Sequence, residues 1–302
     1  MQRLKIKELA KIFLLSFSEF KRNEPLRLAG ATAFFTTFAL PPILIILVQI
    51  IGFAFDIENL RNKFFIRLSE TMGKQTAAQV KQTFSGFTAL AKNWVITIFG
   101  FVFLMFVATT LFKVIKDSLN QLWNVKARTE KPFKLQLKSR AISMIVILLS
   151  GILFIGGMVT EGFVSILPHY TGELPDYTAD FLTTVLKYIV SLLIVTAWFS
   201  ILFKVLPDAK ASWKVVIAGG FFTGVLFTAG KIVIRYALSF GNLKNIFGAS
   251  SSLVLLLLFV FYSSFILYYG ACFTKVFATF IKEPIEAGED AVKYKIVEIK
   301  NH

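Results

Sequence analysis

The segment from Phe203 to Phe277 decides the fold. It begins with the polar turn FKVLPDAKASWK (203–214), continues with the apolar run VVIAGGFFTGVLFTAGKIVIRYAL (215–238), and ends with FGASSSLVLLLLFVFYSSFILYYGACFTKVF (247–277). Each apolar run exceeds the roughly 20 residues that a helix needs to cross the hydrocarbon core of a bilayer. Two such runs in succession predict a membrane-spanning helical hairpin.

The rest of the chain repeats this pattern. Of its 302 residues 56% are hydrophobic and only 17% are charged, and the mean hydropathy is +0.68. We therefore predict an all-α membrane protein with six transmembrane helices in one domain over residues 29–280, preceded by an amphipathic helix (1–28) and followed by a flexible tail (281–302). The predicted spans are about 30–55, 94–114, 141–164, 183–206, 215–238 and 251–273.

Two polar segments carry helical apolar stripes. In residues 4–22 the stripe lies opposite a basic face, which is typical of a helix in the plane of an anionic membrane surface. A helix packed on the ends of the bundle fits the same pattern equally well. Residues 56–93, between spans 1 and 2, predict two short amphipathic helices over the other end of the bundle.

The basic residues predict the orientation. Of the 33 lysines and arginines, 23 lie in residues 1–28, 113–140, 204–214 and 275–302, whereas residues 161–181 contain none. Loops rich in lysine and arginine stay in the cytoplasm. Both termini are therefore predicted to be cytoplasmic.

Pro41 and Pro42 lie in the middle of span 1. A proline inside a helix removes a hydrogen-bond donor and clashes with the carbonyl one turn earlier. We expect a kinked or broken helix, with a simple packing kink assisted by Thr36 or Thr37 as the commoner alternative.

Three spans end alike. The sequences are LFKVIKD (111–117), LFKVLPD (202–208) and the looser FTKVF (273–277). The echo suggests three related helical hairpins, and internal repeats are common in transporters. A lysine that reaches the interface after an apolar run explains the same echo more simply.

Charged residues at the span ends are the candidate site. Lys231 and Arg235 share one face of span 5 near its outer end and are candidates for anion binding, although snorkelling to the interface is the simpler interpretation. Gly220, Gly224 and Thr228 form a stripe of small residues that permits close helix packing. The candidate residues for a cytoplasmic mouth, which surface ion pairing would explain equally well, are Lys113, Asp117, Asn120, Lys204 and Asp208.

The sequence offers little for catalysis. Its two histidines are His169 and His302, its one cysteine is Cys272, and the HExxH, CxxC, P-loop and GxSxG motifs are missing. A hydrolytic metal site needs several converging ligands. We expect no enzyme activity, no metal and no cofactor.

Several motifs together resemble the YihY/BrkB family of bacterial inner-membrane proteins, also labelled ribonuclease-BN-like. They are LAGATAFFTTFALPPIL (28–44), KDSLNQLWNV (116–125), FKVLPDAKASWK (203–214), AGGFF (218–222) followed by Gly230, Lys231 and Tyr236, FGASSS (247–252) and YGA (269–271). The resemblance implies six spans in a bacterial cytoplasmic membrane and adds Tyr236 to the candidate binding residues. The missing metal ligands argue against the ribonuclease label.

These observations favour a transporter of an amphipathic or anionic envelope component, such as a lipid, without its own ATP hydrolysis. The alternative is a scaffold that maintains envelope integrity through its amphipathic helices. The expected partners are membrane lipids rather than nucleic acid, and a homo-oligomer or an envelope protein partner stays open.

Overall fold

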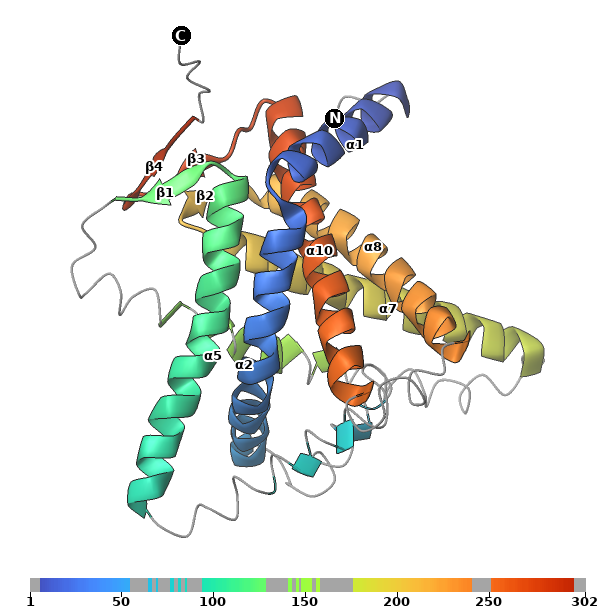
Figure 1. The fold of residues 1–302 in the computed structure, drawn as a ribbon. Coiled ribbons are helices and arrows are strands. Elements are labelled where there is room, and N and C mark those ends of the chain that lie inside the picture. The colour runs from blue at the N-terminus through green and yellow to red at the C-terminus, as the bar shows by residue number, and fades with distance from the viewer. Residues whose placement is uncertain are drawn as a thin grey trace.

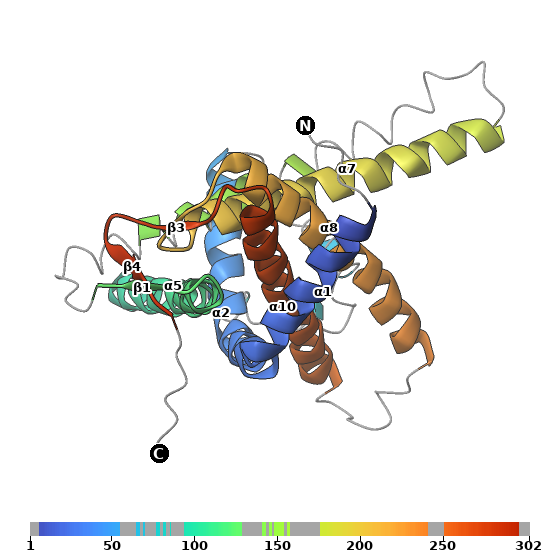
Figure 2. The ribbon, with the colours of Figure 1, turned by 90° about the horizontal axis from the view of Figure 1, so that it is seen from above.

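The protein is a bundle of long helices with small β-pairings at one end (Figures 1 and 2). This computed structural model describes residues 6–54, 94–128, 176–240 and 251–295, with short pieces within 65–85 and 141–157. The helices are α1 (Ile6–Arg22), α2 (Pro25–Ala54), α5 (Trp94–Leu122), α7 (Asp176–Val205), α8 (Trp213–Phe240) and α10 (Ser251–Phe280). The strands are β1 (Val125–Ala127), β2 (Ala209–Lys210), β3 (Glu286–Ala287) and β4 (Ala291–Lys293).

Three of the described helices are long and apolar enough to cross a membrane: Thr183–Val205, Trp213–Val233 and Val254–Phe280. They correspond to predicted spans 4, 5 and 6. Helices α2 and α5 cover predicted spans 1 and 2 and reach 30 and 29 residues. Most of predicted span 3 and of residues 56–93 lies outside the described residues, although the short pieces described there are helical.

Figure 1 shows how the helices are arranged. Helix α10 packs between α2 and α8, α5 packs beside α2, and α7 runs along α8. The carboxyl ends of α5, α7 and α10 meet at the end that carries the strands, which we call the strand end. The sequence echo therefore falls at one end of the bundle, as predicted, while the repeat itself stays a prediction.

The segment after α10 is ordered, so the predicted flexible tail is wrong for residues 281–295. Helix α10 ends with Lys282 at a positive φ of 61° and with the Glu283 amide donating to the Ala278 carbonyl, a Schellman cap. The chain then forms β3, which pairs antiparallel with β2, and β4, which pairs antiparallel with β1. The tail therefore joins the loops that follow α5 and α7.

Helix α1 packs against α10, which favours the second of the two interpretations of residues 4–22. Ile12, Ser16 and Phe20 are buried on this face. The Phe20 ring meets the Phe265 ring edge-on at 4.7 Å, between the ring centroids. Other apolar residues of α1 stay exposed, and Leu14 is 72% exposed.

Helix α2 runs from Pro25 to Ala54 without interruption, so the helix is not broken at Pro41 and Pro42. A kink there stays a prediction. The hydroxyls of Thr36 and Thr37 donate to carbonyls one turn earlier, at Thr32 and Ala33. They do not reach the carbonyls of Thr37 and Phe38 that the prolines leave without a donor.

Candidate functional site

The strand end is built around an ion pair between a buried lysine and a partly buried aspartate. The Nζ of Lys116 on α5 lies 2.7 Å from Oδ1 of Asp208, in the turn between α7 and β2. Asn120, one turn after Lys116, donates to Oδ2 of Asp208 at 3.1 Å, and its own side-chain oxygen accepts from the Asp208 amide at 2.8 Å. The Asp208 carbonyl accepts from the Gly288 amide at 2.9 Å. One turn residue therefore connects α5, α7 and the segment after α10.

Of the five predicted mouth residues, the structure brings Asn120 and Asp208 together. Lys204 makes other contacts: its Nζ donates to the Ala211 carbonyl at 2.6 Å and lies 5.4 Å from the centre of the Trp213 ring. Lys113 and Asp117 are exposed on α5. A cytoplasmic mouth formed by the five residues stays a prediction, while Asp208 itself takes part in an ion pair.

Lys275 on α10 forms a second junction at the strand end. Its ammonium contacts Glu19 of α1, the Leu122 carbonyl at 2.9 Å and the Asn124 side-chain oxygen at 2.7 Å. Asn124 has a positive φ of 54° just after α5 ends, which suits asparagine. Lys275 therefore binds α1 and caps the end of α5 in one arrangement.

A carboxylate lies at the start of α8. Glu283 accepts from the Ser212 hydroxyl at 2.5 Å, and Lys214 lies 3.4 Å from its other oxygen. The hydrogen bond from Ser212, assisted by Lys214, lowers the pKa of Glu283 below its ordinary value. The negative charge also suits the positive end of the α8 dipole.

The predicted outer residues lie far from this cluster. Lys231 follows Trp213 by 18 residues, which places it about 27 Å along α8. It is half-buried, and its Nζ lies 5.6 Å from the centre of the Phe227 ring. The side chains of Arg235 and Tyr236 lie outside the described residues, so their role stays a prediction.

The small-residue stripe on α8 packs closely against α7, as predicted. A Cβ added at Gly220 would lie 2.8 Å from the Thr196 carbonyl oxygen, and one added at Gly224 would lie 3.1 Å from the Thr196 hydroxyl. Within the described part of the chain, the buried hydroxyls of Thr196 and Thr228 have no hydrogen-bond partner. Thr196 on α7 and Thr228 on α8 both lie within candidate membrane spans, where polar atoms without a partner are costly.

Sequence reasoning missed Lys116, Lys275 and Glu283. Lys116 precedes Asn120 by four residues and so shares its helix face, which was an available signal. The partners of Lys275 and Glu283 are distant in sequence, at Glu19 and Ser212. The residues next to Lys275 and Glu283 in the sequence therefore do not predict these contacts.

Long apolar helices and a polar cluster at one end define an integral membrane protein. The chain belongs to the BrkB (YihY) family, since the family model described as Virulence factor BrkB matches residues 16–293. This confirms the resemblance carried by the sequence motifs.

The relatives are bacterial membrane proteins with uninformative names. A UPF0761 membrane protein of Tolumonas auensis is 23% identical over 82% of this chain and 78% of its own length. Others are 25% identical in Mannheimia succiniciproducens, covering 91% and 92%, and 26% identical in Haemophilus influenzae, covering 89% and 94%. The chain spans only 57% of the Pseudomonas aeruginosa relatives. No solved structure matches the chain.

Proposed function

We propose that this protein is a transporter of an anionic, amphipathic envelope component in the bacterial inner membrane, and that a lipid is the class of substrate. The proposal includes six spans, with both termini and the strand end in the cytoplasm. It includes neither catalysis nor ATP hydrolysis. The orientation rests on the basic residues of the loops at the strand end.

The observation that carries the proposal is the ion pair between buried Lys116 and partly buried Asp208. Burying two charges costs several kcal/mol per ion, and apolar side chains often stabilise a fold as well or better. A pair that can separate and exchange its partners for water suits a contact that opens and closes. The pair joins α5 to the turn before α8, so its opening would part these elements at the cytoplasmic end.

Features at membrane depth support the same proposal. Lys231 supplies a cation near the far end of α8, and two buried hydroxyls, those of Thr196 on α7 and Thr228 on α8, have no described partner. Lys231 would hold an anionic headgroup, and a polar group that passes along the helix would form hydrogen bonds with the two hydroxyls. Together they suggest a route along α8 whose cytoplasmic end is closed in this conformation.

The proposal is tested by profiling the lipids and metabolites that co-purify with the protein in nanodiscs. We expect an anionic amphiphile enriched with wild type and lost from Lys231→Ala/Arg235→Ala. Lys187→Ala, which removes an exposed cation of α7, is the matched control and should retain the ligand. Identical ligands in wild type and the double variant would remove the proposed site.

A scaffold that maintains envelope integrity is the second candidate. It is favoured by the two β-pairings and the Lys275 junction, which tie α1, α5, α7 and α10 together at the strand end. A permanent scaffold requires no separation of these elements. Cross-linking the strand end would then leave function intact, whereas it would stop a transporter.

A further inference from the structure

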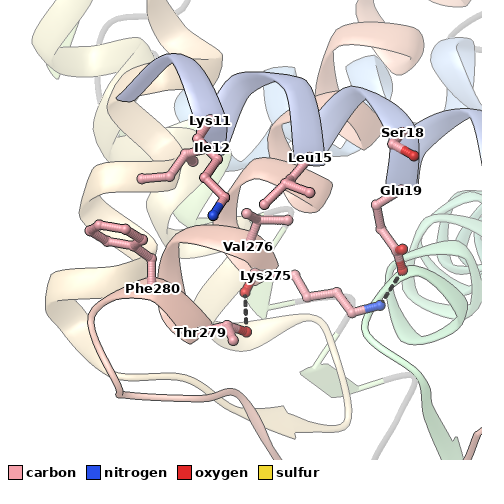
Figure 3. Close-up of a pocket in the computed structure, with 9 residues that line it drawn as sticks. All are labelled: Lys11, Ile12, Leu15, Ser18, Glu19, Lys275, Val276, Thr279 and Phe280. Carbon is pink, nitrogen blue, oxygen red and sulfur yellow. Dashed lines mark hydrogen bonds and ion pairs between the residues drawn. The ribbon is translucent and has the colours of Figure 1, made fainter. Parts of the chain in front are cut away.

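Helices α1 and α10 enclose a pocket that the proposed transport route does not use. Its volume is about 410 Å³, within the range of roughly 300–1,000 Å³ that is usual for ligand sites. One wall is α1 and the other is the last two turns of α10 (Figure 3). The span Val254–Phe280 ends here, so the pocket lies where the apolar part of the chain gives way to the polar cap.

The pocket has an apolar part and one available cation. Ile12, Leu15, Val276 and Phe280 supply the apolar lining. Lys11 extends from α1 into the space between the two helices (Figure 3), and among the described residues its ammonium has no ion-pair or hydrogen-bond partner.

The other two charges of the pocket neutralise each other. Lys275 donates to Glu19, to the Leu122 carbonyl and to Asn124, which occupies all three of its N–H groups. Glu19 is paired with that ammonium. The lining that the structure describes therefore keeps one net positive charge, on Lys11, above an apolar floor.

The exposed side chains of α1 suit contact with lipid. Phe13, Leu14, Leu15 and Phe17 are exposed apolar residues on this helix, and Leu15 both lines the pocket and is 49% exposed. Lys21 and Arg22 add exposed cations near the end of the helix. A basic helix with exposed apolar residues binds at the headgroup level of an anionic leaflet.

We propose that this pocket binds the phosphate headgroup of an anionic phospholipid from the adjacent leaflet. Lys11 holds the phosphate, and the start of an acyl chain lies on Leu15, Val276 and Phe280. The bound lipid bridges α1 and the end of α10 and so stabilises the docked position of α1. The site requires no transport cycle and is separate from Lys231 and Arg235, so it stands independently of the proposed function.

The test measures lipid retained by the full-length protein after extraction from nanodiscs of phosphatidylglycerol and phosphatidylcholine, by native mass spectrometry. Lys11→Gln should lower retained phosphatidylglycerol by about tenfold or more, as expected for the loss of a direct hydrogen bond between an ammonium and a phosphate. Lys21→Gln, which removes an equal charge from the same helix outside the pocket, should lower it by at most about fivefold, the effect of one cation near an anionic surface. Equal losses in both variants would mean that surface charge in general, and not the pocket, retains the lipid. That result would overturn the proposal.

Two further measurements distinguish a lipid headgroup from free phosphate, and this pocket from the proposed site at Lys231 and Arg235. Inorganic phosphate in large excess should not displace the retained phosphatidylglycerol, because it cannot use the apolar lining. Displacement would assign the pocket to free phosphate and overturn a lipid site. Lys231→Ala/Arg235→Ala should keep the Lys11-dependent lipid, and its loss there would show that the retained lipid belongs to the other site.

Discussion

Lys116 and Asp208 form an ion pair in which the cation is far more deeply buried than the anion. The lysine side chain is 4% exposed and the aspartate side chain 20% exposed. Asp208 also receives the amide of Asn120, and its backbone binds both Asn120 and Gly288. The carboxylate is thus closer to water than the ammonium, and the two partners should respond differently to mutation.

We predict that Asp208→Asn destabilises the protein more than Lys116→Met. Removing one partner of a buried pair costs about 3 kcal/mol or more when the remaining charge stays buried. Asp208→Asn leaves a buried ammonium beside a neutral amide, whereas Lys116→Met leaves a carboxylate that reaches water and Asn120. Thermal unfolding in detergent at fixed scan rate should rank the variants in this order.

The double variant Lys116→Met/Asp208→Asn is the control for this asymmetry. It carries no buried charge at this position, so it should recover part of the loss caused by Asp208→Asn alone. Additive losses in the double variant would contradict a direct interaction between the two side chains.

We predict that Gly220→Ala separates α7 from α8. The added Cβ would lie 2.2 Å from the Ser200 hydroxyl and 2.8 Å from both the Ser200 nitrogen and the Thr196 carbonyl oxygen. Backbone atoms cannot rotate away, so the helices must move apart, at about 2 kcal/mol. Gly30→Ala on α2 meets nothing within 4 Å and should be neutral or stabilising. Similar melting temperatures for the two variants would contradict the close α7–α8 packing.

We predict that Glu283 makes stability depend on acid pH. Its pKa is lowered in the folded protein, chiefly by the Ser212 hydroxyl, from an ordinary value of 4.5. Its contribution is therefore complete above that value and is lost as the pH falls through the folded pKa. Thermal unfolding should show the largest difference in stability between wild type and Glu283→Gln near neutral pH. The difference should disappear as the pH falls below 4.5.

Ser212→Ala provides the matched variant for Glu283. Without the hydroxyl the carboxyl loses the main cause of its lowered pKa, so its acid transition should move up toward the ordinary value. A gap between wild type and Glu283→Gln that is the same at every pH would contradict a titrating Glu283.

The spans could be predicted from sequence because their cause is local. Predicted span 5 (215–238) and helix α8 (Trp213–Phe240) differ by two residues at each end. Backbone groups in an apolar environment must form hydrogen bonds within their own helix. About 20 consecutive apolar residues are therefore enough to predict a membrane-spanning helix.

The strand end could not be predicted because its contacts are non-local. Each strand has two or three residues, and Val125 pairs with Lys293. Pieces that short carry no periodicity, so residues 281–295 resemble a flexible tail. In the sequence, Lys116 looks like any lysine near the end of a span. Its ion-pair partner, Asp208, lies 92 positions later, so neighbouring residues do not reveal the pair.

The pairing of β1 with β4 predicts a specific cross-link that also separates the two proposed functions. Lys126 and Val292 are directly opposite each other and exposed. Opposite Cα atoms in antiparallel strands lie about 4.5–5.5 Å apart, a distance that a disulfide can span. Lys126→Cys/Val292→Cys should therefore cross-link under mild oxidation, and the buried native Cys272 should not compete.

Lys126→Cys/Lys293→Cys is the matched control for the cross-link, because Lys293 is the partner of Val125 and its side chain projects from the opposite face of the strand. Equal cross-linking of the two pairs would contradict the register. In proteoliposomes carrying a fluorescent anionic phospholipid, the cross-linked protein should stop moving lipid between leaflets, and reduction should restore the movement. A transporter of the proposed kind must part its helices at the strand end, so lipid movement that persists through the cross-link would contradict a transport route closed there.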